Sequence, residues 1–288
     1  MKAFLDVLLR FFYVAIGLIL VSAFVGLFTH GIQLDARLFL SHIVQILNSF
    51  VSPTDLSVIG PNGMAYSIFL QFWDHYCYSL IIFISALLLS LGLGIGMAYL
   101  TVRLTEKRRQ IVSKTISLLE ALPDLFIIIV IQYGVLFYFK QTGTLLFPVA
   151  GTGQNKSYFL PILALALIPT LMVYKVILFL VQDELEKTYV NLAKSKGFSQ
   201  TYVFFHHILR NITPSIFSHS KSIVLLLLSS MVIFERIFNI NGIFTYIMTY
   251  PEPNVIAFTL ILFYLPIFLL YAFVTLVISK TTGQRLEW

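Results

Sequence analysis

Charged and polar residues with regular spacing concentrate between Asp183 and Gly197, in a chain that is otherwise strongly apolar. If this segment is helical, two sets of side chains lie on different faces. The first set is Leu185, Tyr189, Leu192, Ala193 and Lys196, and the second is Glu184, Glu186, Lys187, Asn191 and Lys194. This pattern predicts a helix that docks on a soluble partner through a packed face with a polar rim. Lys187 is expected on the exposed side.

The end of this segment has the residue types of a helix terminus. Gly197 is the type that a helix C-cap prefers, and Lys194 and Lys196 in the last turn complement the helix dipole. Ser199 can cap a second helix that runs to about Asn211. The sequence therefore predicts a helix, a glycine turn and a second helix between two membrane spans.

Motifs of nucleotide, metal and acyl-transfer chemistry are missing from the sequence. There is no G-x-x-x-x-G-K-[ST] loop to hold nucleotide phosphates, no H-E-x-x-H pair and no G-x-S-x-G turn. Cys77 is the one cysteine, which excludes a disulfide framework within the chain and a cysteine cluster for metal. We expect no catalytic residue, no metal site and no cofactor, so that any ATP is hydrolysed by another polypeptide.

Composition predicts an integral membrane protein. Of the 288 residues, 58% are hydrophobic and 11% are charged, whereas soluble proteins have about 25% charged residues. Apolar runs that can cross a bilayer lie at about 11–30, 76–100, 115–139, 158–181, 213–237 and 255–279. Because backbone groups in lipid must be satisfied within each segment, we expect an all-α fold with six transmembrane helices.

The basic residues predict the orientation. With a cytoplasmic amino terminus, all of the 19 Lys and Arg residues lie inside except Arg37, Lys140, Lys156 and Arg236. Both termini are therefore expected in the cytoplasm, with the first apolar run as an uncleaved anchor. The net charge of +6 then belongs to the inner membrane surface, and no nucleic acid is needed to explain it.

Two blocks of residues resemble a known family. The residues Tyr189-Val190, Ala193, Lys196-Gly197, His207, Leu209-Arg210-Asn211 and Pro214 resemble the cytoplasmic EAA loop of ABC importer permeases. The run from Val232 to Ile243, with Glu235 and Gly242, is similar to a second block of the oligopeptide/dipeptide/nickel branch. The chain departs from the wider superfamily at Asn191 and Leu192, where Glu and Ala are usual.

The resemblance implies a type I ABC importer permease fold and a function. Such a chain forms half of a translocation pathway for peptides, or for a related small solute such as nickel or a metal chelate, in the cell membrane. The implied partners are a second permease subunit of a different sequence, two cytoplasmic ATPases and an extracytoplasmic substrate-binding protein. The ATPases would dock on the 183–211 loop. The residues expected to couple to them are Tyr189, Leu192, Ala193, Lys194, Lys196 and Gly197.

Several residues within the spans are candidates for bends or gates. Pro123, Pro169 and Pro266 interrupt helical hydrogen bonding inside spans, either around a translocation path or as packing kinks. By the resemblance, Glu235 and Gly242 shape the outer half of the protein.

Other residues in or near the spans have competing interpretations. Glu120 and Asp124 are candidates for function because ionisable side chains are costly in hydrocarbon, but we expect them at the hydrated cytoplasmic start of the third span, with Lys114 nearby. Gly92 and Gly96 are expected to allow close helix packing.

The predicted organisation has two parts. Residues 1–75 hold the first transmembrane helix and an extracytoplasmic segment, and residues 76–288 hold a five-helix core with the coupling loop 182–212. Within the first part, apolar spacing from Leu34 to Phe50 predicts a helix, and Pro53, Gly60, Pro61 and Gly63 predict a loop after it. This piece either receives a substrate receptor or packs as a lid on the chain itself.

Two other functions compete with the importer. One is a stand-alone secondary transporter or channel that ATP does not drive, although the sequence has no clear carboxylate relay at mid-depth and no evident inverted repeat. The other is a membrane assembly factor or receptor without a transport role. Neighbouring reading frames for ATPases and a lipoprotein receptor would favour the importer.

Overall fold

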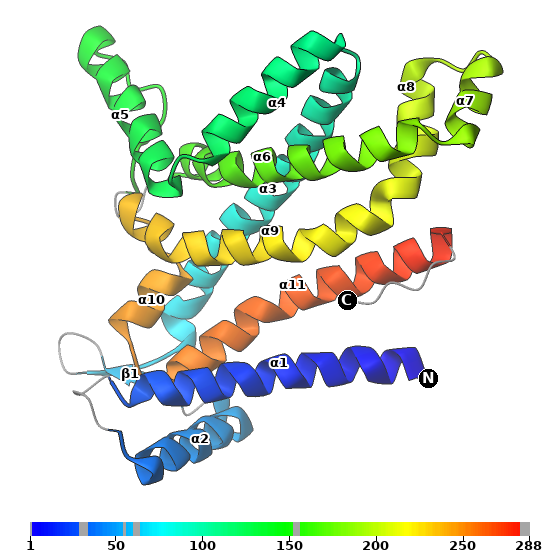
Figure 1. Ribbon diagram of the computed structural model, residues 1–288. Helices are drawn as coiled ribbons and strands as arrows, with labels where there is room; N and C mark the ends of the chain where they lie inside the picture. Colours follow the sequence, from blue (N-terminus) through cyan, green and yellow to red (C-terminus); the bar gives the residue numbers. More distant parts are fainter. Residues whose placement is uncertain (1, 29–33, 54–55, 60–63, 152–155, 283–288) are drawn as a thin grey trace. The chain divides into compact units, whose positions relative to one another are not determined.

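The computed structural model describes residues 2–28, 34–53, 56–59, 64–151 and 156–282 as a set of long helices with one short β-hairpin (Figure 1). The helices are α1 (Lys2–Gly26), α2 (Ala36–Val51), α3 (Phe69–Val102), α4 (Glu106–Glu120), α5 (Asp124–Thr142), α6 (Phe159–Leu185), α7 (Thr188–Ser195), α8 (Gln200–Tyr202), a π-helical turn (Val203–Ile208), α9 (Leu209–Ile237), α10 (Ile243–Thr249) and α11 (Pro253–Thr282). Strands β1 (Ser57–Ile59) and β2 (Ala65–Ser67) pair antiparallel, with Val58 opposite Tyr66.

Six helical segments in the described part of the chain are long and apolar enough to cross a bilayer, which confirms the predicted number of spans. They are Leu8–Gly26, Phe72–Val102, Asp124–Thr142, Phe159–Leu185, Gln200–Ile237 and Pro253–Lys280. The all-helical membrane fold expected from composition is therefore confirmed. Two of the predicted boundaries are wrong, because the third span begins at 124 rather than 115 and the fifth at 200 rather than 213.

The break before the third span has a simple cause. Helix α4 ends at Glu120, and Pro123 is the N-cap of α5 with an extended backbone. Proline lacks an amide hydrogen and disfavours helical geometry in the residue before it, which favours a break at this position. The expectation that Pro123 lies inside a span is wrong, whereas Pro169 and Pro266 do lie inside α6 and α11.

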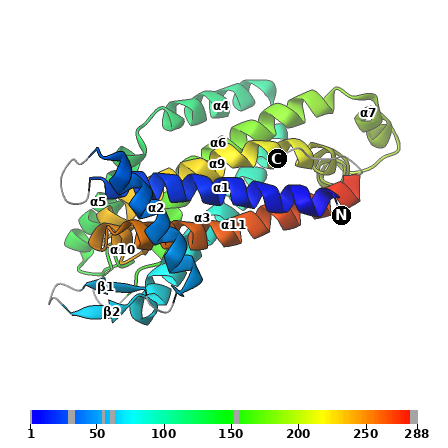
Figure 2. The same ribbon diagram turned by 90° about the horizontal axis from the view of Figure 1, so that it is seen from below.

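The chain forms two compact units, residues 1–80 with 241–276 and residues 81–240 with 277–288. In the first unit α1, α2 and α11 share a core in which Ala23, Ile46 and Ala257 are fully buried. The side chain of Asp35 caps α2 by accepting a hydrogen bond from the amide of Arg37 at 2.8 Å. The helix predicted between Leu34 and Phe50 is therefore confirmed (Figure 2).

The segment after α2 differs from its prediction. Residues 57–59 and 65–67 form the β-hairpin rather than part of a loop. The expected turn residues Gly60, Pro61 and Gly63 lie outside the described residues. The hairpin was not evident in the sequence because each strand has only three residues, too few for an alternating pattern to stand out.

The second unit is organised around α6, most of whose residues are buried. Helix α9 packs along α6, and α4 and α5 contact it as well (Figure 1). Gly94 of α3 makes the closest approach: a Cβ atom there would lie 2.4 Å from Val173 Cγ1 and 3.1 Å from the backbone nitrogen of Tyr174. A Cβ atom at Gly92 or Gly96 would meet nothing within 4 Å, so the expectation that these two glycines mediate packing is wrong.

The contact at Gly94 predicts opposite effects for two glycine substitutions. Gly94→Ala should lower the apparent melting temperature of the purified protein, because overpacking a core costs about 1–3 kcal/mol. Gly92→Ala should leave it unchanged or raise it, because alanine favours a helix interior over glycine by about 0.5–1 kcal/mol. Thermal unfolding of both variants in detergent tests this, and equal melting temperatures would contradict the assigned contact.

Candidate functional site

The segment predicted to dock a partner is two helices rather than one. Helix α6 continues to Leu185, the chain breaks at Glu186 and Lys187, and α7 begins at Thr188. Lys187 is the N-cap of α7, with an extended backbone. The break lets α7 leave the direction of α6 at one end of the second unit (Figure 1).

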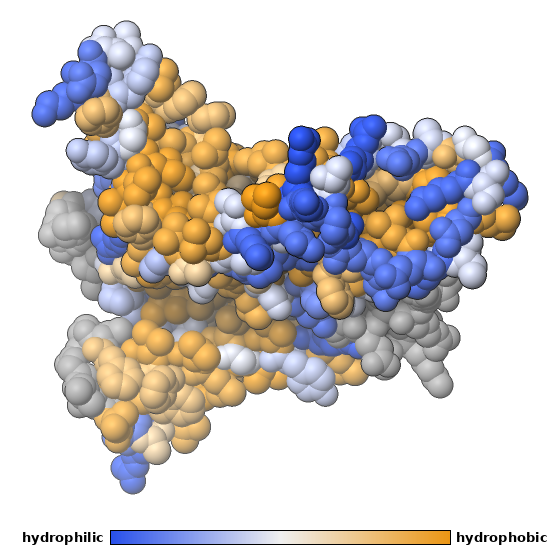
Figure 3. Space-filling view, turned by 45° about the horizontal axis from the view of Figure 1, so that its top comes forward, coloured by the Kyte–Doolittle hydropathy of each residue, from blue (hydrophilic) through white to orange (hydrophobic). Residues whose placement is uncertain are grey.

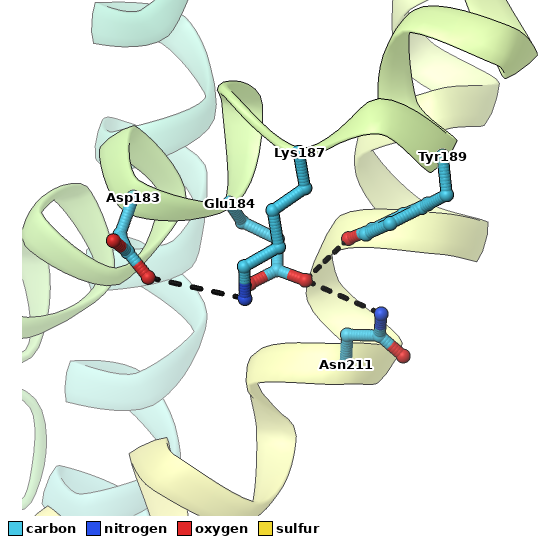
Figure 4. A network of polar contacts seen from close by, with 5 residues as sticks. All are labelled: Asp183, Glu184, Lys187, Tyr189 and Asn211. Carbon is cyan, nitrogen blue, oxygen red and sulfur yellow. Dashed lines mark hydrogen bonds and ion pairs between the residues drawn. The ribbon is translucent and has the colours of Figure 1, made fainter.

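A buried carboxylate holds this break together (Figure 4). Glu184 is among the buried polar residues, with an exposed fraction of 5%. Its Oε1 accepts hydrogen bonds from the Tyr189 hydroxyl at 2.5 Å and from Asn211 Nδ2 at 3.2 Å. Its Oε2 pairs with Lys187 Nζ at 2.5 Å, and that ammonium also lies 3.9 Å from Asp183 Oδ2.

These contacts join three parts of the chain. Glu184 comes from the last turn of α6, Lys187 and Tyr189 flank the start of α7, and Asn211 lies in the first turn of α9. A carboxylate out of water is costly unless it is fully hydrogen-bonded, so the geometry that satisfies Glu184 also fixes where α7 lies. We name these four residues the Glu184 clamp.

The clamp keeps its charges at neutral pH. Burial, with the hydrogen bond to Glu184 second, raises the pKa of the Tyr189 phenol, so the phenol stays protonated and can donate. The hydrogen bond to Glu184 raises the pKa of the Lys187 ammonium, so the lysine stays charged. Both changes keep the donors in the form that Glu184 needs.

The sequence pattern placed Glu184 and Lys187 away from the packed face. This is confirmed for Lys187, which is exposed, and wrong for Glu184, which is buried. One helix through the whole segment was assumed, and the break at Glu186 and Lys187 rotates the residues after it relative to those before. The spacing of three between Glu184 and Lys187 was a visible sign of an ion pair. Asn211 lies 27 residues from Glu184, and no local pattern connects the two.

Helix α7 has a face that packs within the chain and a face that does not. Val190 and Ala193 are buried, with exposed fractions of 0% and 6%. Leu192 is 56% exposed, and Lys194 and Lys196 are exposed as well. The expectation that Ala193 lies on a face open to a partner is therefore wrong, and the available surface is Leu192 with the lysines. In Figure 3 hydrophilic residues gather at the end of the second unit that carries α7, with apolar patches among them.

The glycine turn after α7 is confirmed. Gly197 has φ 81°, in the left-handed region. Its amide donates to the carbonyl of Lys194 at 3.0 Å, and the amide of Phe198 donates to the carbonyl of Ala193 at 3.3 Å. These two bonds form a Schellman motif, which requires the conformation that glycine adopts without strain.

The second helix begins as predicted but does not end near Asn211. The Ser199 hydroxyl accepts a hydrogen bond from the amide of Tyr202 at 3.2 Å, which confirms the cap. The helix then continues through the π-helical turn into α9 without a break. The Tyr99 hydroxyl of α3 lies 2.8 Å from Thr201 Oγ1, which fixes this region to a third helix.

The remaining predicted residues lie in separate places. Glu235 is buried near the end of α9, with an exposed fraction of 1%. Gly242 is the N-cap of α10 and is buried. The roles in gating or in shaping the outer half that the sequence suggested for Glu235, Gly242 and the prolines stay predictions. Among the described residues, no group of three or more His, Cys, Asp and Glu side chains is placed to hold a metal ion.

Known proteins resemble this chain over most of its second unit. The sequence profile of the family described as "Binding-protein-dependent transport system inner membrane component" matches residues 90–282. The dipeptide transport system permease protein DppB of Lactococcus lactis subsp. cremoris (strain MG1363) is 27% identical over 146 residues, which is 49% of this chain and 48% of that protein. The matched region thus spans about half the length of this relative.

The clamp predicts that removing one carboxylate loosens α7 selectively. In Glu184→Ala, Tyr189 and Asn211 lose their acceptor, and backbone hydrogen exchange in Thr188–Ser195 should speed up about tenfold or more. Glu186→Ala removes an exposed carboxylate two residues away and should leave the exchange unchanged. Hydrogen exchange with mass spectrometry measures both, and equal exchange in the two variants would show that Glu184 does not hold α7.

Proposed function

The chain belongs to the family of binding-protein-dependent transport system inner membrane components, and we propose that it is the permease subunit of an ATP-driven importer of peptides. The family match covers 193 of the 288 residues, counted from 90 to 282, and includes the clamp and α7. The chain is a multi-pass inner membrane protein with six candidate spans. The observation that carries the proposal is that α7 is held rigidly at the ends of two long helices while Leu192 stays exposed.

The geometry suits the transmission of movement. A soluble ATPase that grips α7 moves it as a body, and the clamp passes that movement to α6 and α9. A flexible loop would absorb the displacement, whereas here the clamp holds the start of α7, and the Schellman turn and the continuous path from α8 into α9 follow its end. We propose that Leu192 seats in a groove of the ATPase and that Lys194 and Lys196 form the polar rim. Tyr189, Ala193 and Gly197 act in coupling by holding α7 in shape.

The proposed function requires several partner proteins. The sequence holds no phosphate-binding loop, so two cytoplasmic ATPase subunits supply the energy. A second permease subunit, of a different sequence, completes the pathway, and an extracytoplasmic binding protein delivers the solute. The similarity to a dipeptide permease supports peptides as the solute.

Docking on α7 predicts different failures for two neighbouring substitutions. Leu192→Asp puts a carboxylate on the exposed face, so the subunit should accumulate normally but lose ATPase co-purification and uptake, because a buried unpaired charge costs several kcal/mol. Ala193→Asp puts the same charge inside the chain and should lower the abundance of the subunit itself. The control is Thr188→Asp, which puts a carboxylate at the start of α7, where the helix dipole favours a negative charge. This variant should keep ATPase co-purification and uptake.

Pull-down of the tagged subunit with its ATPases, together with quantitation of the subunit in membranes, separates these outcomes. If Leu192→Asp bound its ATPase and imported solute normally, the docking face would be elsewhere.

The proposed orientation, with both termini in the cytoplasm, gives a second prediction. In a Cys77→Ser background, which is needed because Cys77 is exposed, Ser195→Cys should be shielded from an impermeant thiol reagent in intact cells. Met64→Cys, beside the hairpin and 63% exposed, should react. Labelling in intact and permeabilised cells measures the difference. Reaction of Ser195→Cys from outside would reverse the orientation.

A further inference from the structure

An ion pair joins α4 to α6 within the second unit. Lys175 Nζ lies 2.5 Å from Glu120 Oε2, and the two side chains are 45% and 29% exposed. The sequence suggested Lys114 as the neighbour of Glu120, and this is wrong because the ion-pair partner of Glu120 is Lys175. The pair is therefore part of the contact between two helices.

The position of Lys175 along α6 puts the pair far from either end. Helix α6 has 27 residues, which corresponds to about 40 Å at a rise of 1.5 Å per residue. Lys175 is three residues past the middle of this helix, about 4.5 Å from its centre. Lys175 thus lies ten residues inside the candidate span Phe159–Leu185, whereas Glu120 is the last residue of α4, four residues before the next candidate span begins. Assignment of Lys175 to the cytoplasmic surface does not fit this position.

A charged side chain inside a membrane span is stable only in certain environments. Ionisable side chains inside a membrane almost always face a protein interior or a water-filled cavity, because exposure to hydrocarbon is costly. The Lys175 side chain is nearly half exposed, so contacts within the chain leave much of its surface open. Val173 and Ile177, each about half a helical turn from Lys175, are buried, so the opposite side of α6 is the packed one.

A second polar contact lies at the start of α5. Asp124 lies four residues after Glu120 and accepts a hydrogen bond from Ser230 Oγ at 3.1 Å. Asp124 and Ser230 line a small recess between α5, α6 and α9 together with Pro169. Pro169 has no amide hydrogen, so it cannot donate to the carbonyl of Leu165, which is also in the lining. Asp124 and Ser230 are thus the polar side chains in an otherwise apolar recess beside the break at Pro123.

We propose that Lys175 and Glu120 line an aqueous path and bind the two charged ends of a zwitterionic solute such as a short peptide, an inference that rests on the proposed function. Lys175 contacts the solute carboxylate and Glu120 contacts its ammonium group, while the ion pair between α4 and α6 opens. One ion pair is exchanged for two, so charge stays balanced throughout. The net free energy of binding is therefore modest, because the ion pair that is lost offsets part of what the two new pairs contribute. Modest affinity suits a site that a solute must also leave.

Uptake by the assembled transporter tests the solute contact. The measured quantity is the ratio of the uptake rate of a zwitterionic dipeptide to that of its C-terminal amide. Lys175→Met should lower this ratio about tenfold or more, because a charge-assisted hydrogen bond to the peptide carboxylate is lost. Glu120→Gln should do the same relative to the N-acetylated dipeptide. Lys140→Gln, at the exposed end of α5, should leave both ratios unchanged. Unchanged ratios in both test variants, or wild-type uptake in Lys175→Met/Glu120→Gln, would reduce the pair to a structural contact.

Thiol labelling of the whole complex in native membranes tests the aqueous path without relying on uptake. In a Cys77→Ser background, Lys175→Cys should react with a water-soluble thiol reagent. The zwitterionic dipeptide should slow that reaction about tenfold, and the N-acetylated amide should not. Absence of labelling, or labelling that neither peptide slows, would overturn the proposal. Failure of the proposed function is a different result, in which the wild-type complex with its ATPases imports no dipeptide of any form.

Discussion

The desolvation of one carboxylate, that of Glu184, determines how the docking end of this protein is built. A buried carboxylate is tolerated only where donors surround it, and here the donors come from the start of α7 and from α9. Because Lys187, Tyr189 and Asn211 must all reach the same two oxygens, α7 has one position relative to α6 and α9. The Schellman turn at Gly197 then fixes the other end of α7. A helix of eight residues, too short to be stable alone, thus becomes a rigid element.

The same requirement, that charge out of water must be paired, distinguishes two parts of the second unit. At the Glu184 clamp nearly all of the residue is enclosed, and we assign the pairing a structural role. At Lys175 and Glu120 the pair is partly open, and the site can exchange its partners. In our account the first site transmits movement and the second meets the solute. The two sites share α6, whose long buried face against α3 and α9 connects them.

Much of the fold could be predicted from the sequence because membrane helices are specified by local composition. The six apolar runs, the cap at Ser199 and the turn at Gly197 depend on residues close in the chain, and each is confirmed. The errors arise where distant residues decide the outcome. The partner of Glu184 in α9, the partner of Glu120 in α6 and the close approach at Gly94 each join segments that no periodicity relates. The face of α7 was misassigned because a two-residue break at Glu186 and Lys187 changes its rotation.

The central claim is that α7 moves as one body with α6. The most direct test is the distance between spin labels at Ser195 on α7 and Phe179 on α6, two exposed positions. Pulsed electron–electron double resonance measures this distance in the complete transporter. Recorded with and without ATP, while the complex changes conformation, the mean distance and its distribution should stay the same. A shift or broadening of several Å on adding ATP would show that the break between the two helices acts as a hinge, and would contradict the account.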